Sequence, residues 1–138
     1  MDLSLLRQKS EAFIADMDFH IATAFEQNEN NLVKLNVDQM LKSKTSKDST
    51  ITPKYSAKYA KRKGFSNPNL KLSGDFQKEM FLSVSEKEHF FGSFDFKTPF
   101  LTERYSEDIF GIAPSNIAKE RKLVGKSLLK LYESKVFL

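Results

Sequence analysis

The fold is decided by the stretch NLKLSGDFQKEMFLSV, residues 69–84, in which a small polar turn separates two apolar runs. After the turn, Met80, Leu82 and Val84 alternate with the residues of the opposite face. Such alternation is typical of a strand that has one buried face. A polar Glu-Lys-Glu connection follows, and apolar residues then alternate again at Phe90, Phe94 and Phe96. We therefore predict an antiparallel β-hairpin near residues 80–96.

Helices are predicted on both sides of the hairpin. Apolar residues recur at intervals of three and four over residues 3–25, and a second apolar pattern covers residues 28–44. A short helix is expected over residues 53–64, with Thr52 as its N-cap, because proline suits the first helical position and glycine often ends a helix. The last helix is expected from Ser115 onward, where apolar residues again line one face.

Length and composition indicate one folded domain. A chain of 138 residues is long enough to bury about two-thirds of the surface that it exposes when unfolded. We expect a single domain over residues 1–138, of the α+β class, with N- and C-terminal helices packed on a small antiparallel β-sheet. Residues 43–52, SKTSKDSTIT, offer almost nothing to bury, so we predict a flexible basic loop there.

The segment between the hairpin and the last helix is less regular. Gly92, in the second predicted strand, indicates a bulge or a close backbone approach. Pro99 begins an expected helical turn, a loop follows at residues 106–108, and the apolar patch at residues 109–112 is expected to be buried. The apolar end at residues 136–138 is expected to pack on the domain or to contact a neighbouring molecule.

Positive charge is concentrated in one segment of the chain. Residues 42–63 carry eight basic side chains and one acid, a local charge of +7 in a chain of net charge +4, so the remainder is mildly acidic. Two interpretations stay open: contact with nucleic acid, or docking of the basic patch of one molecule on an acidic patch of the next. The side chains expected to contact DNA or a neighbouring subunit are Lys54, Lys58, Lys61, Arg62 and Lys63.

Two tyrosines, Tyr55 and Tyr59, lie one helical turn apart within this basic segment. Aromatic side chains among basic ones can stack on bases while the basic groups bind phosphates. In the alternative interpretation, the tyrosines pack inward and dock the short helix, and the lysines lie in solvent.

The sequence offers no convincing catalytic site. The chain has no cysteine, which excludes a thiolate nucleophile and Cys-ligated metal centres, and it carries no glycine-rich phosphate loop and no serine elbow. A nuclease-like set would combine Glu120 and Lys122 with Asp95 or Asp108 around Mg²⁺, but Glu120 and Lys122 fall on different faces of the last helix. The two histidines, which lack a second catalytic group in the sequence, are His20 and His89. We expect no enzymatic activity, no cofactor and no metal.

The first residues, MDLSLLRQKSEAF, contain Asp2 and reach Arg7 after a short apolar run. They are therefore expected to form neither a signal peptide nor a membrane span, and no membrane association is predicted.

The order of features from residue 55 onward resembles that of a group of tailed-bacteriophage neck and tail-completion proteins. Members of that group carry a leucine-rich lead into a Leu-x-[Ser/Thr]-Gly-Asp-[Phe/Leu] turn, followed by a hairpin, an aromatic-rich connection and a closing helix. The corresponding stretches here are LKLSGDFQKEMFLSV, FFGSFDF, TPFLTERYSEDIFGI and the helix from Ser115. Many members differ in having a shorter basic loop and a threonine at the place of Ser73.

The resemblance implies an architectural role for the turn, whose residues are Leu72, Ser73, Gly74, Asp75 and Phe76. Leu72 and its neighbour Leu70 would anchor the incoming chain, and Ser73 would cap the segment that begins at Asp75. Gly74 would take a backbone conformation that a Cβ resists, and Phe76 would turn into the core.

The resemblance also implies a structural virion protein, made in the host cytoplasm and located at the head-to-tail junction. Copies would form an oligomeric ring that seals and adapts between portal and tail and lets DNA pass. The implied partners are the protein itself, the portal and other neck or tail proteins, with non-specific contact to DNA in the lumen. The alternative is a nucleic-acid-binding module that uses the basic segment at residues 42–63.

Overall fold

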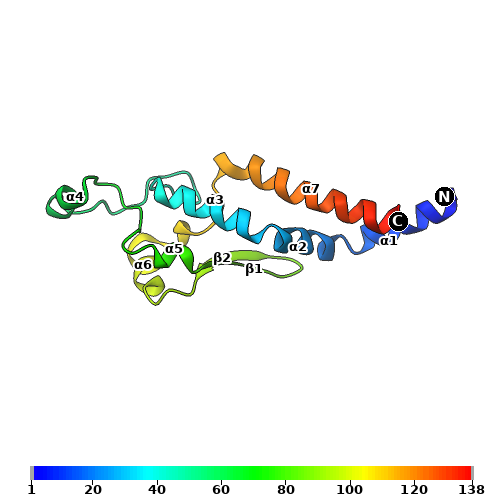
Figure 1. Cartoon of the computed structure of the whole chain (residues 1–138), viewed down its shortest axis with the longest axis horizontal. Coiled ribbons are helices and arrows are strands. Elements are labelled where there is room, and N and C mark those ends of the chain that lie inside the picture. The colour runs from blue at the N-terminus through cyan, green and yellow to red at the C-terminus, as the bar shows by residue number, and fades with distance from the viewer. Residues whose placement is uncertain (1, 138) are drawn as a thin grey trace.

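A computed structural model describes residues 2–137 and shows an α+β fold in which helices pack on a two-stranded antiparallel sheet (Figure 1). The longer helices are α1 (Leu3–Ala15), α2 (Met17–Gln27), α3 (Glu29–Leu41) and α7 (Ile117–Val136). The shorter ones are α4 (Ala57–Lys63), α5 (Asp75–Lys78) and α6 (Thr98–Tyr105), with single 3-10 turns η1 (Glu107–Ile109) and η2 (Pro114–Asn116). The strands are β1 (Met80–Val84) and β2 (His89–Ser93). The predicted fold class and hairpin are thus confirmed.

The N-terminal helical run is divided at two polar residues. The sequence predicts one helix over residues 3–25, but the backbone leaves helical geometry within it at Asp16 (φ −102°, ψ 24°). The second break, at Asn28 (φ −107°, ψ 13°), agrees with the predicted boundary between the first helical pattern and the second. Asp and Asn have low helix propensity because their short side chains compete for backbone hydrogen bonds. The Asn28 Nδ2 group donates to the Ala24 carbonyl and to Ser127 Oγ, each at 2.8 Å. The second break therefore also ties the run to α7.

Helix α7 lies alongside α1 and α2, and the start of α1 and the end of α7 lie at the same end of the molecule (Figure 1). Phe13 stacks on His20 with ring centroids 4.0 Å apart, and Tyr132 of α7 meets Phe13 edge-on at 5.2 Å. His20 is consequently buried in an aromatic cluster. Val136 is buried on the domain, while Phe137 contacts Tyr132 edge-on and stays half exposed. Leu138 lies outside the described residues.

The hairpin has an unbroken antiparallel register from Met80↔Ser93 to Val84↔His89. Its inner pair, Leu82 and Phe91, packs with side chains of α2, α3 and α7 in one core cluster: Ala24, Leu32 and Val124. The sequence pattern assigns three phenylalanines to the second strand: Phe90, Phe94 and Phe96. The strand β2 ends at Ser93, before the last two, and all three side chains are exposed. The neighbour Phe91 enters the core in their place.

The hairpin has no bulge at Gly92, because the pairing of β1 with β2 continues on both sides of this residue without interruption. A Cβ at this position would lie only 2.7 Å from the ring of Phe81, its cross-strand neighbour. The glycine therefore provides room for an aromatic ring and not for a second backbone.

A second core cluster fills the space beneath α3 and around α5 and α6. Its buried members come from seven different helices, strands and loops and are Met40, Ile51, Leu70, Phe76, Met80, Tyr105 and Ile109. Val33 and Phe110 pack against both clusters. Met80 and Leu82, two residues apart on the inner face of β1, thus belong to different clusters.

The predicted loop at residues 43–52 is closely tied to the rest of the fold. Ile51 is fully buried, so the expectation that this segment has almost nothing to bury is wrong. The Ser46 N–H donates to the Asp108 carbonyl at 2.7 Å, and Asp48 accepts from the Ser115 hydroxyl at 2.6 Å. Lys44 and Thr50 form an isolated antiparallel bridge.

The short basic helix begins later than the sequence predicts. The Thr52-Pro53 peptide is cis, and α4 starts only at Ala57, with Ser56 as its N-cap. The prediction that Thr52 caps a helix starting at Pro53 is therefore wrong.

Within residues 2–137, no helix has the length and apolar character that a bilayer crossing requires.

Candidate interaction surfaces

The first candidate surface is a loop-helix-loop, residues 54–66, which we call the basic arm. A hydrogen bond of 3.0 Å from the Tyr55 N–H to the Ser66 carbonyl closes its base. Ser56 Oγ accepts from the Tyr59 N–H at 3.3 Å, and Gly64 ends α4 in the left-handed conformation at φ 89°. None of the seven residues of α4 is buried, and the helix stands at the end of the molecule opposite the termini (Figure 1).

The basic side chains predicted as contact residues divide into two kinds. Lys54, Lys58, Lys61 and Arg62 are exposed on the arm. Lys63 differs, because its Nζ atom lies 5.7–5.9 Å from the ring centroids of three aromatic side chains and donates to the Lys71 carbonyl at 2.7 Å. Lys63 therefore helps to hold the arm together, and the other four present charge to solvent.

The tyrosines of the arm pack inward. Tyr55 and Tyr59 meet edge-on with centroids 4.8 Å apart, and both are only partly exposed. Burial raises the pKa of Tyr55, against hydrogen bonding with the backbone at Asn69 that acts in the opposite direction. This arrangement favours the interpretation in which the tyrosines dock the helix over the one in which they stack on bases.

The turn at residues 72–76 connects the arm to the hairpin. Phe76 is 1% exposed in the core, and Gly74 has φ 90°, the left-handed conformation that favours glycine. Ser73 Oγ accepts from the Asp75 N–H at 3.4 Å and donates to its carboxylate at 2.9 Å. Leu72 is 74% exposed, so its expected role as an anchor is wrong. Leu70 alone of the leucine pair is buried there.

Aromatic side chains project from the outer side of the hairpin. Phe81 stacks on Phe94 at 4.3 Å between centroids and meets Phe90 at 6.3 Å. We call these three residues the aromatic face. Phe90 and Phe94 are exposed, and Phe96 beyond them is 79% exposed beneath the Lys97 ammonium group, which lies 4.9 Å from its ring centroid. Contiguous exposed aromatics of this kind are typical of interaction surfaces.

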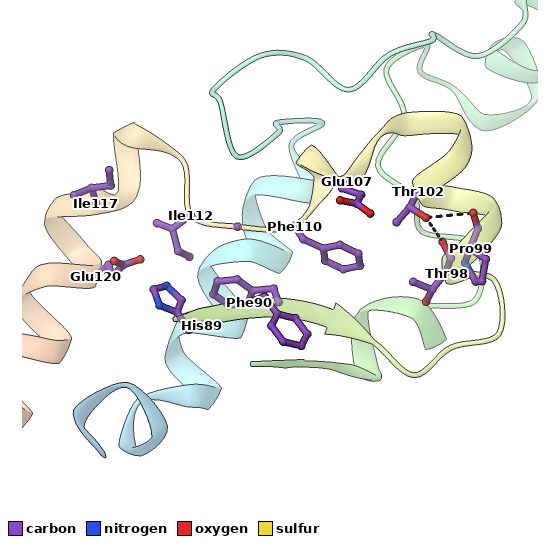
Figure 2. A pocket seen from close by; sticks show the side chains of 12 residues that line it. His89, Phe90, Thr98, Pro99, Thr102, Glu107, Phe110, Ile112, Ile117 and Glu120 are labelled. Atoms are coloured by element: carbon purple, nitrogen blue, oxygen red, sulfur yellow. Dashed lines mark hydrogen bonds between the residues drawn. The ribbon is translucent and has the colours of Figure 1, made fainter. Parts of the chain in front are cut away.

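A groove of about 860 Å³ opens beside the aromatic face, between β2, α6, η1 and the first turn of α7 (Figure 2). Its apolar floor includes Phe91, Phe110 and Ile112. Glu120 and His89 lie at one end, and Glu107 lies nearer α6 at the other, as Figure 2 shows. We call this feature the acidic groove. These carboxylates come from separate elements, so their proximity to one groove had no signature in the sequence.

Burial raises the pKa of Glu120, although the charges of His89 and Arg121 act to lower it. A carboxylate whose pKa is raised by desolvation is stabilised by a cation that approaches it. The groove thus has an acidic group that a basic occupant would satisfy.

One wall of the acidic groove is the edge of β2 that faces away from β1, where the Ser93 carbonyl accepts from Thr98 Oγ1 at 3.1 Å. Phe94 and Ser85 donate backbone hydrogen bonds across the hairpin to Glu79 and Glu88, at 3.1 and 2.8 Å. Hydrogen-bonded pairs alternate with non-bonded ones in an antiparallel ladder, so Phe91 belongs to a non-bonded pair. Its backbone N–H and C=O groups therefore point away from β1, toward the groove. On the opposite edge, the Leu82 N–H is satisfied by Glu29 Oε2 at 3.1 Å.

The acidic residues of the nuclease-like set do not converge. Asp95 accepts from the Lys97 backbone N–H at 2.8 Å and pairs with its ammonium group at 3.0 Å. Desolvation would raise the pKa of Asp95, but these bonds and the Lys97 charge outweigh it and lower the pKa. Asp108 pairs with Lys47 at 3.3 Å. Among residues 2–137, no group of three His, Cys, Asp or Glu side chains is placed to hold a metal ion.

Comparisons with family models, with curated proteins and with solved structures found no match to this chain.

Proposed function

We propose that the protein is a structural subunit of a tailed-bacteriophage neck, where copies form an oligomeric ring between portal and tail through which DNA passes. The observation that carries the proposal is the aromatic face. The exposed Phe90 lies on β2 and the exposed Phe94 follows it directly, in a hairpin that is entered through the Leu-x-Ser-Gly-Asp-Phe turn. A fold that leaves such side chains in solvent gains free energy when another protein surface covers them.

The arrangement of charge also supports a ring. The basic arm and the acidic groove lie on different elements of the same subunit. Contacts between unlike surfaces of identical subunits are head-to-tail, and they close into a ring when the rotation between neighbours allows it. On this proposal, the partners are other copies of the chain, the portal and neighbouring neck or tail proteins, and the assembled protein resides in the virion.

The test is electron microscopy of the purified protein, alone and mixed with purified portal, together with analytical ultracentrifugation over a range of concentrations. We expect ring-shaped particles or a complex with the portal. A protein that stays monomeric at its highest soluble concentration, and that also does not bind the portal, contradicts the proposal.

The second candidate function is a nucleic-acid-binding module. It is favoured by the exposed Lys54, Lys58, Lys61 and Arg62 on an arm whose helix buries none of its residues. Such binding depends steeply on salt, because each neutralised phosphate releases counterions. A titration with duplex DNA at several salt concentrations tests it, with the triple variant Lys58→Ala, Lys61→Ala, Arg62→Ala. If the wild-type affinity falls steeply with salt and the variant loses binding, the module is favoured over the ring.

A further inference from the structure

We propose that the acidic groove of one subunit receives the basic arm of a second copy of the same chain. This inference rests on the proposed ring and specifies which two surfaces form the contact between subunits. The acidic groove is lined by residues of β2, α6, η1, α7 and the connection at residues 110–112, and none of these lining residues belongs to the arm of the same chain.

Charge complementarity identifies the occupant. The basic arm, residues 54–66, contains five basic residues and no acid, and four of them are exposed. The acidic groove carries Glu107 and the partly buried Glu120, whose pKa burial raises. Arg121 is the basic side chain that acts on Glu120 from its own helix. His89, at the same end of the groove, also acts on Glu120. A lysine of the arm would add positive charge to that of His89 and Arg121, next to a carboxylate whose pKa burial still raises.

The low burial of α4 also supports docking of the arm on another molecule. A helix as short as α4 is marginal in water unless tertiary packing supports it. Within the subunit, α4 receives a Ser56 cap, a Gly64 stop and the ring contacts of Lys63, yet none of its residues is buried. Packing α4 against the apolar floor around Phe91 and Phe110 would add to the partial burial that Tyr59 has against Tyr55.

The outward edge of β2 at Phe91 adds a polar wall that suits the arm. The backbone groups of Phe91 point toward the groove, as the hairpin register requires. Unpaired carbonyls at a strand edge accept hydrogen bonds from an incoming chain. The ammonium and guanidinium groups of the arm are donors without acceptor capacity, which matches these carbonyls and the two carboxylates.

The test exchanges the charges of the two surfaces. One variant carries Lys58→Glu and Lys61→Glu in the arm, and the other carries Glu107→Lys and Glu120→Lys in the groove. Each variant alone sets like charges against each other, so we expect association measured by sedimentation velocity to weaken at least tenfold. An equal mixture provides a complementary pair at both junctions, and we expect it to restore association. A matched control reverses two exposed lysines of α7, Lys126→Glu and Lys130→Glu, and should associate like the wild type.

A covalent readout complements this experiment, because the chain has no cysteine of its own. A Lys61→Cys protein mixed with a Thr102→Cys protein should form an intermolecular disulfide on mild oxidation. A Lys126→Cys protein mixed with the same Thr102→Cys protein should not. Circular dichroism of each variant establishes that it is folded before association is measured.

The outcomes separate the inference from the proposed function. If the wild type forms rings and both charge variants form them equally well, the arm-to-groove contact is wrong while the ring stands. The same conclusion follows if the arm variant loses DNA binding and keeps its association. If the wild type never associates, alone or with portal, both the contact and the ring are contradicted.

Discussion

The side-chain amide of Asn36 pairs with the backbone of Gly111 as a neighbouring strand would. Asn36 Oδ1 accepts from the Gly111 N–H at 2.9 Å, and its Nδ2 group donates to the Ile109 carbonyl at 2.9 Å. One turn later, Gln39 repeats the pattern with the Gly111 carbonyl at 2.9 Å and the Ala113 N–H at 2.8 Å. Two amides on one face of α3 thus hold the segment that forms one side of the acidic groove.

Replacing Asn36 should be strongly destabilising. Asn36→Ala leaves the Ile109 carbonyl and the Gly111 N–H without partners in a buried place, and each such group costs about 1–3 kcal/mol. We expect the free energy of unfolding to fall by about 2–4 kcal/mol in urea denaturation. Asn31→Ala, at an exposed position of the same helix, is the control and should change it by less than about 0.5 kcal/mol. Equal effects of the two substitutions would show that the amide pairing is not what stabilises the segment.

Two glycines should respond to alanine with opposite signs. Gly74 has φ 90°, where an L side chain is strained, so Gly74→Ala should lower the free energy of unfolding by about 1–2 kcal/mol. Gly125 lies in the middle of α7 with open space around it. Gly125→Ala should therefore raise the free energy of unfolding by about 0.5–1 kcal/mol. Thermal denaturation of the two variants beside the wild type measures both, and a stabilising Gly74→Ala would contradict the assigned role of the turn.

Gly92→Ala should rearrange the aromatic face. The new Cβ would lie 2.7 Å from the Phe81 ring, so the ring has to move and its stacking on Phe94 at 4.3 Å is lost. Aromatic pairs contribute about 0.5–1.5 kcal/mol, and we expect a loss of stability in that range. In the Phe81→Leu background, the same glycine substitution should have a smaller effect. A double-mutant cycle by urea denaturation measures the difference, and additive effects would contradict the ring approach.

The hydrogen bonds of Asp48 should make stability depend on pH. The Ser115 hydroxyl, and then its backbone N–H, lower the pKa of Asp48 below 3.8, against a smaller effect of desolvation. A carboxyl group with a lowered folded-state pKa stabilises the fold above its unfolded pKa, and this contribution is lost as pH falls through the folded pKa. Asp48→Asn should therefore be less stable than the wild type at neutral pH and converge with it at acidic pH below 3.8. Denaturation midpoints across this range test the effect. If the difference in stability between Asp48→Asn and the wild type were the same at every pH, the charge of Asp48 would not be its cause.

The fold was predictable where a pattern is local. The alternation from Met80 to Val84 predicts β1, and the apolar spacing after Ser115 predicts α7 closely. The predictions were wrong where tertiary contacts decide which residues are buried. Ile51 sits among polar neighbours in sequence yet fills the second core cluster, and Phe91, not Phe90, enters the core because the register of the hairpin decides which face each residue occupies.

The candidate surfaces were predictable only in part. The basic residues of the arm lie close together in the sequence, so the sequence alone identifies them. The acidic groove joins Glu107, Glu120 and β2 from separate elements, and only the folded chain brings them together. The same holds for Asn36 and Gly111, whose pairing spans 75 positions and has no periodicity to reveal it.

Strand β1 places Met80 in one core cluster and Leu82 in the other, while Val33 and Phe110 contact both. Neither core cluster can unfold without removing side chains that pack against the other cluster. Heating should consequently convert the folded chain into unfolded chain in a single cooperative transition, with equal calorimetric and van't Hoff enthalpies.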